Sequence, residues 1–326
     1  MKHTPALSER AAYDRRAMSR GCSCSFVGRP SWVVVVVLLG LLLWPTGSAA
    51  AEAPCRPAED DPRVTGAPDD GRAASLPRPF QTQPWAADAA QLLANAQQQA
   101  ATELDAAGAP SCYASLLPGI AARTGFLSPY EFLVVGYYEH DWDTRDGLLR
   151  LYRDDPQQAV RRLADIWPSP RAELLIHTPA FFDLDTNQVY VNRGAVTPDQ
   201  APNVVVHEFW HALANVQFSS RPDGTTSRTT GFWTEVRPAE GRAWRPVDEQ
   251  VEGGVPTYLM NEAVAIEMEV GATGREHPQM RPDLLEAMST LHELFEVAGR
   301  SRVLQLYLES RSDELKGIAH QAAVRG

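Results

Sequence analysis

Two histidines and a glutamate lie within five residues near the middle of the chain, in "HEFWH". His207 and His211 are one helical turn apart, so their imidazoles project from the same face of a helix. Two neutral imidazoles in that arrangement can bind one zinc ion at about 2.0–2.1 Å each. Glu208 lies one residue step around the helix, where its carboxylate can take a proton from a zinc-activated water. The spacing predicts a zinc site with Glu208 as general base. The alternative is a helix whose histidines contact neighbouring side chains or face solvent.

This segment resembles the zincin metallopeptidases, which carry the pattern HExxH on a helix. In the metzincin branch, Gly and then His or Asp follow the second His at intervals of three residues. The chain has Ala214 and Gln217 there, which disfavours that branch.

"NEAVA", residues 261–265, looks like the segment that carries the third zinc ligand in the gluzincins, the thermolysin-like branch. The resemblance implies one catalytic zinc ion held by His207, His211 and Glu262, with the fourth coordination position left for water. Glu249 and Glu252 are the alternatives for the third ligand.

The chain departs from the thermolysin-like pattern in two ways. Glu262 follows His211 by 51 residues, a longer interval than in thermolysin, and Ile266 occupies the place of the acid that supports the first histidine. We expect Glu267 or Glu269 to contact His207 instead. Zincins also use a His or Tyr to stabilise the oxyanion, and the sequence leaves this role open among Tyr258, His277 and His292.

The segments around this motif predict a mixed α and β domain. Apolar residues at helical spacing predict helices at 86–108, 128–138, 154–167, 197–218, 255–271 and 281–299, with Gly271 ending the fifth. Strands are predicted for "AELLIHT" (172–178) and "QVYVN" (188–192), with a turn at "DLDTN" (183–187) before the second. The centre of 128–138 also fits a strand.

Two segments are expected to bound the substrate cleft. By resemblance, Val189 to Asn192 would be a sheet edge that pairs with an extended peptide, while an ordinary core strand is the alternative. The polar stretch from Ser219 to Gly254 is expected to frame one side of the cleft and to act as a lid.

The first 53 residues have the order of a secretory signal peptide. Basic residues precede the apolar run Val33 to Trp44, and small residues around Ala51 and Ala53 follow it. The run has twelve residues, against about twenty for a spanning helix. A retained N-terminal membrane anchor is the alternative. Residues 54–84 predict a flexible linker, and residues 85–326 the catalytic domain. The helix within 85–110 is either the first helix of that domain or part of a propeptide.

Charge and cysteine content agree with an exported protein that binds neither nucleic acid nor, after cleavage of the leader, a membrane surface. The leader carries six basic and three acidic residues, so its removal changes the net charge from −11 to −14. Such an acidic product disfavours polyanionic partners. Cys55 and Cys112 remain, and one disulfide between them is expected in an oxidising compartment, with two free thiols as the alternative. We expect a periplasmic, secreted or envelope-associated location.

Together these features predict an α+β, zincin-like fold with a small mixed sheet, an active-site helix and a mainly helical C-terminal part. The predicted function is an exported zinc metallopeptidase acting on peptide or protein substrates. Two other hypotheses stay open. One is a catalytically inactive zincin-fold protein of the envelope, and the other is a zinc hydrolase of a non-peptide bond.

Overall fold

The computed structural model describes residues 88–138, 141–167, 169–240, 244–247, 249–277 and 280–325. The predicted signal peptide, the linker and Cys55 lie outside these residues, so leader cleavage and the Cys55–Cys112 disulfide stay predictions. No helix in the described part of the chain is both long enough and apolar enough to cross a membrane.

The first sheet has three strands in the order β1-β3-β2 and is mixed. β1 (Thr124–Leu127) runs parallel to β3 (Gln188–Asn192), and β2 (Ala180–Asp183) runs antiparallel to β3. Asp183 begins the turn between β2 and β3, where Thr186 Oγ1 donates to its carboxylate (2.7 Å) and Asn187 adopts a positive φ of 51°. The predicted strand 188–192 and the turn before it are confirmed.

Alternation along these strands gives the sheet two buried faces, because successive side chains point to opposite sides. Val189 and Val191 of β3 face a large core built on α8 (Ala201–Leu213), α2 (Ala89–Ala106) and α3 (Cys112–Ala122). Tyr190 faces a second, smaller core. Both cores meet at β3, which fixes the strand centrally and buries its side chains from Val189 to Asn192.

The second core belongs to four helices inserted between β1 and β2: α4 (Pro129–Tyr137), α5 (Trp142–Asp154), α6 (Pro156–Ala164) and α7 (Pro170–His177). α4 begins with a capping box, in which Ser128 and Glu131 bond each other's backbone N–H groups, so the helical reading of 128–138 is the correct one. The predicted strand at 172–178 is wrong, because this segment forms α7. Ser169 and Pro170 start the helix, and its short apolar run leaves Leu174 69% exposed.

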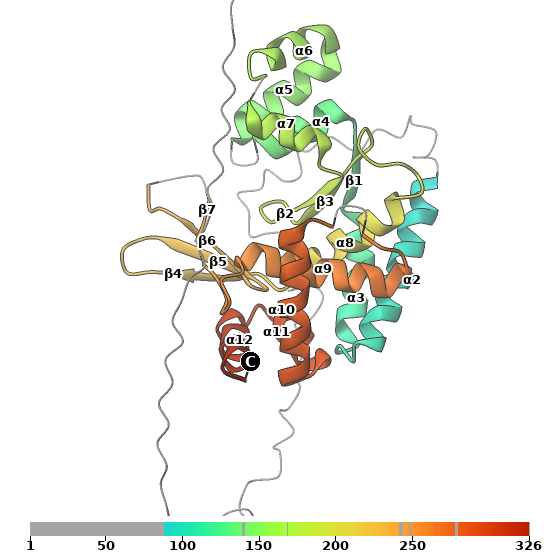
Figure 1. Ribbon diagram of the computed structural model, residues 1–326. Coiled ribbons are helices and arrows are strands. Elements are labelled where there is room, and N and C mark those ends of the chain that lie inside the picture. Colours follow the sequence, from blue (N-terminus) through green and yellow to red (C-terminus); the bar gives the residue numbers. More distant parts are fainter. Residues whose placement is uncertain are drawn as a thin grey trace, which may run out of the picture. The chain divides into compact units, whose positions relative to one another are not determined.

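α2 lies behind α8 and α9 (Thr257–Thr273) and packs against both (Figure 1). Its Ala96 and Ala100 are completely buried, and small side chains allow the helices to approach closely. These contacts favour the reading of this helix as part of the domain rather than of a propeptide.

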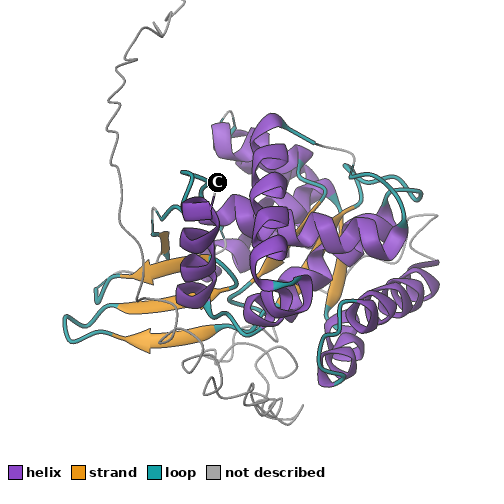
Figure 2. Cartoon of the chain, turned by 60° about the horizontal axis from the view of Figure 1, so that its bottom comes forward, coloured by secondary structure: helices purple, strands orange, loops and turns teal. Residues whose placement is uncertain are grey.

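The polar stretch after α8 forms a second, antiparallel sheet (Figure 2). It has four strands in the order β4-β5-β6-β7. Its strands are β4 (Gln217–Ser220), β5 (Thr226–Thr230), β6 (Trp233–Arg237) and β7 (Arg245–Pro246). The predicted helix over 197–218 therefore ends earlier, at Leu213, and Gln217 already belongs to β4.

The C-terminal part is helical, as predicted, with α9, α10 (Pro282–Ala298), α11 (Arg300–Leu308) and α12 (Ser312–Arg325). Gly271 does not end α9. The helix continues to Thr273 and is closed by Gly274, whose φ of 65° is left-handed. At Gly271 a Cβ would lie 2.5 Å from Glu103 Oε1, so this glycine allows α2 to approach α9.

Candidate metal centre

α8 presents His207, Glu208 and His211 from one buried element. The helix carries apolar residues on most of its surface, and Val205, Phe209 and Leu213 are completely buried. Tight packing of these neighbours holds the polar residues in place, and the His207 and His211 side chains are only 9% and 17% exposed. The predicted spacing on one helix face is the observed one.

α9 packs across α8 (Figure 1). This packing brings the Glu262 carboxylate to the two imidazoles. Glu262 Oε2 lies 3.3 Å from His207 Nε2, and Glu262 Oε1 lies 3.5 Å from His211 Nε2. The two Nε2 atoms are 3.2 Å apart. The three side chains named by the sequence therefore converge on one point, although Glu262 lies 51 residues beyond His211.

These separations match those expected around a tetrahedral zinc ion. Ligand bonds of about 2.0–2.1 Å place neighbouring ligand atoms about 3.3–3.4 Å apart. Two imidazole nitrogens and a carboxylate are also a usual donor set for a catalytic zinc. His207, His211 and Glu262 thus fit a divalent ion in both spacing and chemistry.

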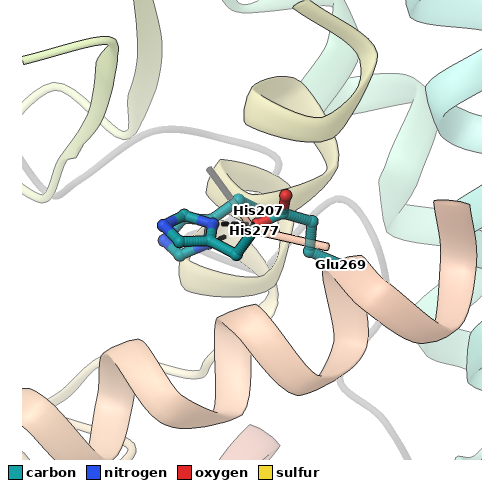
Figure 3. A group of neighbouring side chains, drawn as sticks. All are labelled: His207, Glu269 and His277. Atoms are coloured by element: carbon teal, nitrogen blue, oxygen red, sulfur yellow. Dashed lines mark hydrogen bonds and ion pairs between the residues drawn. The ribbon is translucent and has the colours of Figure 1, made fainter. Parts of the chain in front are cut away.

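Glu269 contacts the other side of the His207 ring and also His277 (Figure 3). His207 Nδ1 lies 3.2 Å and His277 Nδ1 2.8 Å from the same oxygen, Glu269 Oε2. When His207 Nδ1 donates a hydrogen bond to Glu269, the ring carries its proton on Nδ1. The lone pair of Nε2 is then free to bind a metal. The His277 ring is stacked on that of His207, with centroids 5.5 Å apart.

The other acids named from the sequence lie elsewhere. Glu267 contacts His292 at 3.1 Å and Arg300 at 3.6 Å, not His207. Glu249 forms an ion pair with Lys316, and Glu252 lies 3.0 Å from His320. Of the two candidate partners for His207, Glu269 is the one in contact with it. Glu249 and Glu252, the alternatives to Glu262, contact Lys316 and His320 and not the two histidines of α8.

The charges of these groups depend on one another. Burial lowers the pKa of His207, but hydrogen bonds with Glu262 and Glu269 outweigh burial and raise it well above the usual value. Partial burial raises the pKa of Glu262, but His211 and His207 outweigh it and hold that pKa well below the usual range. For Glu208 burial dominates, and its pKa is raised despite the two histidines. A raised pKa is suited to a carboxylate that accepts and returns a proton near neutral pH.

His207, His211, Glu262 and Glu208 line a cleft of about 590 Å³. Of the residues considered for oxyanion stabilisation, Tyr258 and His277 line the cleft, and His292 does not. The stretch 219–254 contributes part of the wall, as expected, through Arg228, Thr230, Trp233 and Glu235. Its action as a lid stays a prediction.

The prediction that residues 189–192 form a sheet edge is wrong, because they belong to β3, the central strand of the sheet. β3 is central, so residues 189–192 are already paired on both sides and cannot accept another strand. The cleft is lined instead by residues 178–184, which include the whole of the edge strand β2. Sequence patterning could not distinguish the two, because strand order depends on tertiary pairing.

Two residues that position the cleft were not identified from the sequence. Asn261, next to Glu262, accepts from Phe232 N (2.7 Å) and donates from Nδ2 to Thr230 O (3.1 Å), which holds the β5–β6 turn on α9. Gly231 in that turn has a φ of 54°, and a Cβ there would lie 2.4 Å from the buried Tyr307 ring. The Asn in "NEAVA" was the available signal.

No protein-family model, curated protein or solved structure matches this chain significantly.

Proposed function

We propose that the protein is an exported zinc metallopeptidase with a zincin-like, thermolysin-type site. The observation that supports this most is the convergence of His207, His211 and Glu262 at separations of 3.2–3.5 Å, with Glu208 beside them in the same cleft. Export rests on the leader-like sequence alone.

A divalent ion bound by these three residues would polarise a substrate carbonyl and lower the pKa of a water molecule. Glu208 takes the proton of the attacking water and delivers it to the leaving nitrogen. Its burial supports that role, because the proton is then held away from bulk solvent at a carboxylate of raised pKa. Glu269 keeps the His207 ring in one orientation during the reaction.

The edge strand β2 offers a place for the peptide backbone. Asn192 N donates to Pro179 O (2.8 Å), so this pair is hydrogen-bonded. Hydrogen-bonded pairs alternate along an antiparallel ladder, which directs the N–H and C=O groups of Ala180 and Phe182 away from β3. An extended peptide can use these groups as an added strand.

His277 is the residue we assign to stabilise the oxyanion. Its Nδ1 is engaged by Glu269, so the remaining ring nitrogen, Nε2, is available to a group in the cleft. Tyr258 lies one helical turn before Glu262 on the same face of α9, and it is the alternative donor.

The test combines metal analysis with a peptidase assay. The purified protein should contain about one zinc ion per chain, which His207→Ala should lose. Glu208→Gln should retain the zinc but lower kcat on casein or a peptide mixture by about 10²–10⁴-fold. A protein without metal, or a fully active Glu208→Gln variant, would refute the proposal. Zinc with activity only on non-peptide esters or amides would instead favour a zinc hydrolase of another bond.

A further inference from the structure

An ion-pair bridge joins the two walls of the cleft beyond the end of β2. Arg228 of β5 contacts Asp185, in the turn after β2, through Nη1 (2.5 Å) and Glu235 of β6 through Nη2 (2.6 Å). The guanidinium also lies over the Trp244 ring, 4.3 Å from its centroid, and the Arg228 side chain is only 6% exposed. Bonds to two carboxylates and an aromatic ring make the bridge rigid.

This bridge limits how far a peptide can extend along β2. Beyond Asp183 the chain continues through Leu184 to Asp185, which Arg228 ties to the second sheet. A peptide added to the free edge of β2 would meet the bridge at that point. The groove is therefore bounded at the Asp183 end.

The direction of pairing decides which end of a peptide meets the bridge. Antiparallel strand pairs outnumber parallel ones about two- to three-fold. A strand added antiparallel to β2, which runs from Ala180 to Asp183, begins at the Asp183 end. The amino terminus of the substrate then lies at the bridge.

The charges at this end also suit an amino terminus. Glu235 lines the cleft there, and the positive charge of Arg228 is already shared by Asp185 and Glu235. Both contacts of Glu235 with Arg228 use Oε2, which leaves Oε1 for a ligand. An α-ammonium group gains a carboxylate partner here, whereas a substrate carboxylate would meet like charge.

We propose that the site is an exopeptidase site that recognises the free amino terminus of a peptide and releases a short N-terminal piece. The inference rests on the proposed metallopeptidase function. Water is the co-reactant: its oxygen bonds to the carbonyl carbon, the C–N bond breaks, and a proton passes to the leaving nitrogen. Glu235 binds the α-ammonium group, and the Arg228 bridge excludes longer chains from that side.

Three versions of one peptide test the proposal on the zinc-loaded full chain: unmodified, N-acetylated and C-terminally amidated. Acetylation should lower kcat/KM about tenfold or more, because it removes a charge-assisted hydrogen bond. Amidation should leave kcat/KM unchanged, and mass spectrometry should show short N-terminal fragments. Equal cleavage of free and acetylated peptides, or cleavage mainly inside the peptide, would overturn the inference and leave the metallopeptidase proposal intact. If none of the peptides is cleaved, the proposed function itself fails and the inference with it.

A variant pair tests the role of Glu235. Glu235→Gln should raise KM for the unmodified peptide and reduce the preference over the acetylated one by at least several-fold. Glu286→Gln, a solvent-exposed change of the same charge on α10 outside the cleft lining, should keep the full preference. Unchanged discrimination in a folded Glu235→Gln protein would contradict the assignment of Glu235. If that variant does not fold, the wild-type peptide series still decides the proposal.

Discussion

Glu262 and Glu269 lie seven residues apart on α9 and approach opposite nitrogens of the same imidazole. Glu262 Oε2 is 3.3 Å from His207 Nε2, and Glu269 Oε2 is 3.2 Å from His207 Nδ1. Seven residues are about two helical turns, so both carboxylates leave the same face of α9. One helix thus supplies both a candidate metal ligand and the carboxylate that orients its neighbouring ligand.

Replacing Glu269 by Gln should weaken zinc binding about 10–100-fold, because the charge that orients His207 is lost. Zinc affinity is measured by competition with a chelator. Glu267→Gln is the matched control, since Glu267 is on the same helix but contacts His292 and Arg300, and it should leave the affinity unchanged. Equal affinities for the two variants would show that Glu269 does not support the metal site.

Zinc binding should release about one proton at pH 7. Hydrogen bonds with Glu262 and Glu269 raise the pKa of His207 well above its usual value without metal, which favours the protonated ring, whereas a metal ligand must be neutral. The proton competes with zinc, so the affinity should fall as the pH falls through this pKa, beginning above pH 6.5. Calorimetry in two buffers of different ionisation heat measures the release. A binding heat independent of buffer would contradict protonation of His207.

Gly231→Ala should destabilise the protein more than Gly253→Ala. Both glycines have a positive φ (54° and 87°), which costs an alanine about 1–2 kcal/mol. At Gly231 the added Cβ also meets Tyr307 and Asn261 within 2.7 Å, whereas at Gly253 it meets nothing within 4 Å. The overlap should add about 1–3 kcal/mol at Gly231. Denaturant unfolding of both variants measures the difference, and equal losses would show that the β5–β6 turn is not held as described.

A chain that begins at residue 88 should fold and bind zinc, whereas one that begins at residue 111 should not. The second lacks α2, whose Ala96 and Ala100 are completely buried against the core that carries the site. Its removal would expose the apolar backs of α8 and α9 to water. Circular dichroism and zinc content report the outcome. If the shorter chain folds and binds zinc, the helix is separable, as expected of a propeptide.

The sequence determined what depends on local spacing. "HEFWH" fixed the helical face that His207 and His211 share, since one helical turn links residues four apart. The helices predicted at 128–138 and 86–108 form for similar local reasons, since Ser128 caps the start of the first and Gly108, with its positive φ, follows the end of the second. The strand predicted at 172–178 failed, because a short apolar run fits a strand and a buried helix equally well.

Tertiary structure decided which distant groups meet. Spacing alone could not choose among Glu249, Glu252 and Glu262, or between Glu267 and Glu269, because the packing of α9 on α8 makes that choice. The sequence pattern could not identify β2 as the edge strand, since both strands of the hairpin carry apolar residues. The pairing of β3 with β1 is what leaves β2 at the edge. Residues close in sequence are placed by backbone geometry, whereas residues far apart meet only through the packing of the whole core.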